Sequence, residues 1–262
     1  MAEEPPGKAV EFNIKLAAGE HTIEASARIP DRPLRVTDLL PILLSFDEAV
    51  IGLAAGQVER QGKQVSCRAG CAACCRQLTP IGESEAYYLA ELVDSTPVER
   101  QQVVRERFRK TLAALEERQI LARLRRPWEL KALEDRRKIG TEYFALGIPC
   151  PFLEEERCSI HPHRPMCCRE YLVTSPAVNC RTPGPETIKK VPLPVKFSEI
   201  LYTFGDGVGR QTTRWLPLVL ALEWVAERKS QPQPTFPGPQ LFRNFLSLIS
   251  AIARKTDQPP VV

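Results

Sequence analysis

The sequence predicts a mainly α-helical protein with a small β-hairpin at its N-terminus and an irregular, cysteine-rich middle. Three observations predict this fold class. Apolar and polar side chains alternate over residues 9–29, apolar side chains recur at helical spacing in most later segments, and nine cysteines fall mostly in two compact stretches. The 262 residues, 43% hydrophobic and 26% charged, suit a globular chain of one large domain or two small ones.

The N-terminal segment is expected to form the hairpin. Apolar residues occupy every second position on both sides of a turn signal at 17–20, first Val10, Phe12, Ile14 and Leu16, then Ile23, Ala25, Ala27 and Ile29. A period of two predicts two antiparallel strands with one buried face. Pro30 and Pro33 end the second strand.

Helices are expected through most of the rest. Thr37-Asp38 can cap a helix over 38–61, with Pro41 tolerated in its first turn. Thr96-Pro-Val-Glu99 offers a cap, a proline at the first helical position and a capping glutamate for a helix from 97 to about 124. Further helices are expected at 83–93, 129–146, 197–204, 215–228 and 239–254.

Charge and hydropathy favour a cytoplasmic protein without a membrane or nucleic-acid partner. The net charge of +4 is too small to indicate either surface by itself. The segment 97–126 is basic, which fits a surface for RNA or an acidic partner, but its interleaved glutamates favour a solvated helix face. Neither a basic leader before an apolar run nor an uncharged apolar stretch of about 20 residues is visible.

The first cysteine stretch has the chemistry of a metal site. Cys67, Cys71, Cys74 and Cys75 would share one stripe of a helix, at positions i, i+4, i+7 and i+8. Clustered cysteines in a reducing compartment are more often metal ligands than disulfides, and adjacent pairs suit a disulfide framework poorly. Thiolate sulfur suits zinc and iron–sulfur clusters.

The second stretch supplies further donors. It contains Cys150, Cys158, Cys167, Cys168 and, twelve residues on, Cys180. Cys158 and His161 have chelating spacing, so His161 is a candidate nitrogen ligand. Together the stretches offer more ligands than one four-coordinate ion uses. A polynuclear site, two sites, or one site plus free thiols would each account for the surplus.

Other catalytic signatures are weak. Gly205-Asp-Gly-Val-Gly209 lacks the spacing and the strand–helix context of a nucleotide-binding loop. Cys67, Cys71 and Cys74 match the triplet spacing of radical SAM enzymes, but not its setting in a loop after the first strand of a barrel. Only three histidines are present, and no Ser–His–Asp arrangement stands out.

The cysteine motifs resemble those of the YkgJ-type cysteine-cluster family, a zinc- or iron-chelating domain. The resemblance rests on C-x3-C-x2-C-C, then C-P-F-L, then C-x-I-x-x-x-R-P-x-x-C-R, and covers about residues 64–182. It implies the ligands Cys67, Cys71, Cys74, Cys75, Cys150, Cys158 and Cys168, with Arg164, Pro165 and Arg169 as a framework around the last of them. Cys180 is a plausible additional ligand, and no ligation is carried over to Cys167.

Two departures from the family pattern bear on the site. Three residues separate the first two cysteines where the family often has two, and His161 stands where a tyrosine is usual. Some relatives are described as iron–sulfur oxidoreductases, and a flagellin lysine methylase has a similar cysteine motif. The resemblance therefore implies a redox or protein-modifying role with a protein substrate or redox partner, and leaves open whether this chain is an enzyme.

The chain is accordingly divided into three domains. An N-terminal hairpin and helix (1–63) precede an irregular helical cysteine-cluster metal-binding domain (64–182), and a proline-rich helical extension follows (183–262). The helices of 97–146 are expected as an insertion that brings the two cysteine stretches side by side. The expected cofactor is an iron–sulfur cluster or iron, and the alternative is a structural zinc in a non-catalytic binding module.

Overall fold

The computed structural model describes residues 8–18, 21–184, 186–204 and 214–256. Over these residues the chain is mainly helical with a small N-terminal hairpin, which confirms the predicted fold class. The glycine-containing segment 205–209 lies outside the described residues. The three-domain division stays a prediction.

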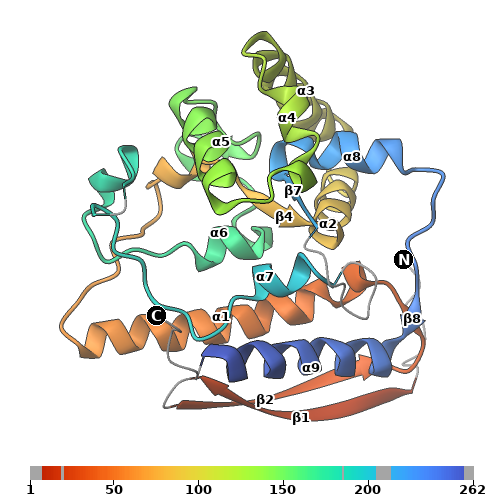
Figure 1. Ribbon diagram of the computed structural model, residues 1–262. Coiled ribbons are helices and arrows are strands. Elements are labelled where there is room, and N and C mark those ends of the chain that lie inside the picture. Colours follow the sequence, from red (N-terminus) through yellow and green to blue (C-terminus); the bar gives the residue numbers. More distant parts are fainter. Residues whose placement is uncertain (1–7, 19–20, 185, 205–213, 257–262) are drawn as a thin grey trace.

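The hairpin and two long helices form one layer of the molecule, at the bottom of Figure 1. β1 (Ala9–Ala18) pairs antiparallel with β2 (His21–Pro30), from Ala9 opposite Pro30 to Ala18 opposite His21. α1 (Val36–Arg60) and α9 (Gly238–Thr256) pack on this sheet. The buried side chains here, called the hairpin core, include Ile23, Ala27, Ile29, Leu39, Leu40, Leu43, Phe197, Ile200, Phe204, Leu241, Phe242 and Phe245. The period-two pattern thus identified the buried face of β2.

α9 is brought close to the hairpin by a glycine. A Cβ at Gly238 would lie 2.4 Å from the carbonyl oxygen of Pro30, so a larger residue would push the helix away. The amide of Gly238 donates to the carbonyl of Arg32 at 2.9 Å, beside the pairing of β3 (Pro33–Leu34) with β8 (Phe236–Pro237). The two ends of the described chain therefore meet in one layer.

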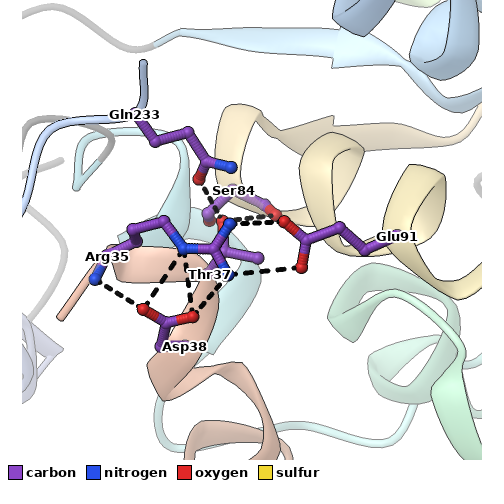
Figure 2. A network of polar contacts seen from close by, with 6 residues as sticks. All are labelled: Arg35, Thr37, Asp38, Ser84, Glu91 and Gln233. Atoms are coloured by element: carbon purple, nitrogen blue, oxygen red, sulfur yellow. Dashed lines mark hydrogen bonds and ion pairs between the residues drawn. The ribbon is translucent and has the colours of Figure 1, made fainter.

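A polar cluster fixes the start of α1 against α2 (Glu83–Asp94), as Figure 2 shows. Arg35 forms ion pairs with Asp38 and with Glu91, each at 2.5 Å. Burial opposes ionisation of Asp38, but hydrogen bonds from the Arg35 side chain and amide outweigh it and hold the pKa of Asp38 below its ordinary value. Thr37 donates to the side-chain oxygen of Gln233 at 2.6 Å, which ties in the segment before β8.

The upper part of Figure 1 is a second, helical layer. It consists of α2, α3 (Val98–Glu117), α4 (Leu121–Leu124), α5 (Leu133–Ala145), η2 (Pro127–Glu129), η5 (Leu218–Leu220) and α8 (Ala221–Glu227). β4 (Pro80–Gly82) and β7 (Trp215–Pro217) pair antiparallel beneath it. Its buried side chains, the helical core, include Ile81, Leu89, Val104, Phe108, Leu115, Leu124, Tyr143, Phe152, Leu216 and Leu220.

Three helix boundaries differ from the prediction. The helix expected to reach 124 ends at Glu117, because Gln119 takes a left-handed φ of 56° and the amide of Ile120 returns to the carbonyl of Leu115. The helix expected from 129 begins at Leu133. The segment 215–217 is a strand rather than helix, because Pro217 excludes the helical conformation from the residue before it.

α1 is long and apolar enough, by length and composition alone, to cross a membrane. Core helices of soluble proteins share that property. Here the buried apolar side chains of α1 as far as Val50 pack in the hairpin core, and Asp47 and Glu48 stand near the middle of the helix.

Candidate metal centre

The first cysteine stretch is not the regular helix that its stripe suggested. Residues 67–72 are irregular, and only η1 (Ala73–Arg76) is a short 3₁₀-helix. Gly70 has a φ of 81°, a conformation that ends any helix entering from the N-terminal side. Only Cys74 and Cys75 lie on this turn, where their thiols are hydrogen-bonding neighbours, so the four thiols do not form one helical stripe.

The two cysteine stretches nevertheless lie side by side, as predicted. The amide of Cys150 donates to the carbonyl of Cys75 at 2.7 Å. Cys158 follows on a tight hairpin, β5 (Leu153–Glu154) and β6 (Arg157–Cys158), whose turn residues Glu155 and Glu156 have positive φ. Cys168 lies on α6 (Met166–Glu170), after η3 (His161–His163), and Cys180 on η4 (Ala177–Arg181), which packs on η1.

The thiols fall into two groups of electrostatic neighbours, and Cys74 interacts with members of both groups. Cys67, Cys71 and Cys180, the first thiol group, are neighbours of one another and of Cys74. Cys150, Cys158 and Cys168, the second thiol group, are coupled to one another and again to Cys74. Burial and then neighbouring thiolates raise the pKa of Cys150, and both also raise the pKa of Cys67 and Cys158. A cation among these sulfurs would reverse that repulsion.

Arg164 lies between the two groups. Its guanidinium acts to lower the pKa of Cys67 and Cys158 against the larger opposing effect of burial, and that of Cys74 against the hydrogen bond with Cys75 and then burial. The Nε atom of Arg164 is buried and has no hydrogen-bond partner among the described residues. A buried donor beside soft sulfur atoms is the kind of group that orients and stabilises an anionic thiolate–metal unit.

Two other arginines hold the backbone around the thiols. Arg169 is buried and bonds Glu48 on α1 at 2.6 Å. Arg169 also donates to the carbonyls of Arg164 and Pro162, and so holds the loop before α6. Arg76 is the arginine that reaches the β5–β6 turn, with Glu156 at 2.6 Å.

Cys167 borders the second thiol group through its neighbour Cys168, whereas His161 is exposed and lies apart from both groups. The Cys167 thiol donates to the carbonyl of Pro80 at 2.9 Å, on the side of the helical core. His161 is exposed on η3, and nearby Arg164, then burial, lower its pKa. These placements favour leaving Cys167 out of the ligand set and give no support to a nitrogen ligand at His161. The ligand set itself stays a prediction.

The donor chemistry fits zinc or iron, although the thiols do not converge. No three histidine, cysteine, aspartate or glutamate side chains in the described part of the chain are arranged to hold a metal ion as they stand. Seven thiols, each a soft donor, are nevertheless linked by pairwise interactions that meet at Cys74. They sit on short elements and irregular backbone.

Behind the cysteine loops lies a set of buried acids that sequence analysis missed. Glu85 accepts from the amides of Gly82 and Met166, both at 2.8 Å, and burial raises its pKa to about 7. Glu170 accepts from the amide of Ser198 at 2.9 Å. Asp47 is fully buried, and neither of its oxygens has a partner among the described residues. A signal was present for Asp47, since it continues the apolar stripe of Leu40, Leu43 and Leu44.

The comparisons with known proteins give one match. A family model, CxxCxxCC, described as "Putative zinc- or iron-chelating domain", matches residues 66–189. No curated protein and no solved structure matches the chain. The matched range contains both thiol groups, Cys74 and Arg164, and confirms the family that the cysteine spacing suggested. Residues 66–189 therefore match the CxxCxxCC family, whose domain is described as zinc- or iron-chelating.

Proposed function

We propose that the chain holds a cysteine-ligated iron–sulfur centre that spans both thiol groups. The position of Cys74 supports this most directly, because Cys74 is the one thiol coupled to members of both groups. A single tetrahedral ion takes four ligands, whereas seven thiols lie around this point. An iron–sulfur centre takes thiolate ligands at each of several irons and so uses more of them.

The proposed role is redox or protein-modifying, with a protein substrate or redox partner, in a reducing compartment such as the cytoplasm. When bound, an iron–sulfur group supplies one-electron chemistry whose potential depends on nearby charge and hydrogen bonds. The chain's own contribution is Arg164, whose buried Nε and positive charge face Cys74 and one cysteine of each group. Six of these seven thiols are only partly buried, which leaves the centre within reach of a partner.

The test is anaerobic purification followed by metal and sulfide analysis and a visible absorption spectrum. An iron–sulfur centre gives a brown protein with iron and labile sulfide, bleached by air. A colourless protein with stoichiometric zinc after the same preparation would overturn the proposal.

Ligand variants sharpen the test. Cys74→Ser should lose nearly all bound metal, because Cys74 serves both groups. Cys71→Ser and Cys158→Ser, one from each group, should each reduce it substantially. Cys167→Ser is the matched control, since that thiol bonds the Pro80 carbonyl instead. Equal loss from the control would show that the assignment around α6 is wrong by one residue.

A second candidate function is a binding module with structural zinc. Its support is that the thiols come from two stretches far apart in the chain, 67–75 and 150–180, and lie on short elements or irregular backbone. A zinc ion there would act as a cross-link, and its binding free energy would be folding free energy. Zinc removal would then abolish the order of these segments without any change in redox behaviour, because zinc has no redox chemistry.

A further inference from the structure

A groove of about 840 Å³ lies between α3 and the segment that carries Cys150. Its floor is apolar, formed by Ile148, Pro149, Pro151 and Leu153, with Cys150 between the two prolines. Because proline has no N–H, two of these backbone positions offer no donor to a ligand. Contact with the floor is therefore mainly apolar, and the volume suits a ligand or peptide segment of several residues.

The walls of the groove carry an excess of positive charge. Arg107, Lys110 and Arg157 line it, together with Glu154 and Glu155. The carboxylate of Glu154 is already held by two arginines, Arg107 and Arg100. One negative charge between two positive ones leaves that wall of the groove cationic.

The other two basic side chains of the groove, Lys110 and Arg157, have weak ion pairs or none among the described residues. Lys110 reaches Glu106 only at 3.7 Å, and Arg109 pairs with the same carboxylate at 2.5 Å. Arg157 forms no ion pair within the described residues. Lys110 and Arg157 are therefore the cations best placed to bind an incoming carboxylate.

We propose that this groove binds an acidic segment of a partner protein, with an apolar side chain on the proline-flanked floor and carboxylates at Lys110 and Arg157. Charge complementarity favours an acidic occupant, and the apolar floor favours a peptide over a small hydrophilic anion. Cys150 belongs to both the floor and the second thiol group, so a bound segment lies beside the metal centre. Only that last consequence rests on the proposed function, because none of the contacts proposed for the peptide is made to the metal.

The probe is a fluorescent dodecapeptide of alternating glutamate and leucine, followed by anisotropy, with a lysine–leucine peptide of equal length as its control. The double variant K110E/R157E should weaken binding of the acidic peptide by about tenfold or more. E155Q, which removes the groove's own exposed carboxylate, should strengthen it. The matched control is R118E/K229E, which changes the net charge equally at two exposed side chains outside the groove.

Three outcomes would overturn the proposal. One is equal weakening by the control variant, which would mean that net charge alone attracts the peptide. Another is equal binding of the lysine–leucine peptide. The third is full competition by free glutamate at concentrations near those of the peptide, which would mean that the groove takes small anions. The titration is run on the protein as purified, with its metal identified in the same preparation: retained binding by a protein that holds zinc would leave the groove proposal intact even if the iron–sulfur assignment failed.

Discussion

The hairpin layer and the metal centre are held together by different means. In the hairpin layer, Leu39, Leu43, Phe242 and Phe245 are completely buried and sit on regular helices of 25 and 19 residues. Around the metal centre, eight of nine cysteines keep partial exposure, and the elements that carry them are two to five residues long. Apolar burial can stabilise the first region alone, whereas the second has little of it and needs another source of order.

The largest expected effect is therefore that of metal removal on one region only. Stripping the metal with a chelator should abolish amide protection over 66–76, 150–168 and 177–181, while β1, β2, α1 and α9 remain protected. Structural zinc contributes about 10 kcal/mol or more to folding in small domains, more than any single side chain. Hydrogen exchange resolved by mass spectrometry measures both regions at once. Uniform loss of amide protection through the hairpin layer would show that the two regions are not stabilised separately.

A substitution in the hairpin core should instead lower stability without affecting the metal. Phe242 is fully buried and packs edge-on against Phe12, with ring centroids 5.0 Å apart. Phe242→Ala should lower the free energy of unfolding by about 3–5 kcal/mol, because it leaves a cavity among large side chains. Denaturant titration gives the loss, and metal content per folded molecule should stay constant. A parallel fall in bound metal would show that the two regions are not independent.

The same contrast explains what could be predicted from the sequence. Alternation in 9–29 identified the buried residues of β2, because a single buried face decides a strand's pattern locally. That the two cysteine stretches lie side by side was predicted. The hydrogen bond from the Cys150 amide to the Cys75 carbonyl was not, because it depends on irregular backbone. Arg169 and Glu48 stand 121 positions apart, and no local pattern encodes that pair.

Asp47 provides a pH-dependent test at the boundary between the regions. Burial, reinforced by Glu170, raises the pKa of Asp47 to about 8, against the partial relief from Arg169. Glu85 and Glu48 also face it and raise the pKa further. Because the pKa of Asp47 is higher in the folded than in the unfolded protein, protonation of Asp47 stabilises the fold. This stabilisation is complete below the ordinary pKa near 3.8 and is lost as the pH rises through about 8.

Wild-type stability should therefore fall between pH 5 and 8, at up to about 1.4 kcal/mol per pH unit from Asp47. Asp47→Asn should reduce that slope without removing it, because Glu85 titrates in the same range. Asp38→Asn is the matched control of opposite sign, since the lowered pKa of Asp38 contributes stability that is lost only at acid pH. Thermal melts at several pH values measure both, and an unchanged slope in Asp47→Asn would contradict the assignment.

The smallest effect is expected at the ion pair that joins the two cysteine stretches at the surface. Arg76 on η1 meets Glu156 in the β5–β6 turn at 2.6 Å, but the Glu156 side chain is 54% exposed. Water and salt screen such a pair, so Arg76→Gln should cost about 0.5 kcal/mol and leave bound metal unchanged. A loss above about 2 kcal/mol, or loss of metal, would mean that the pair holds the stretches together. The cysteine stretches would then be held in place before the metal binds, and the two regions would differ only in how much of their stability comes from the metal.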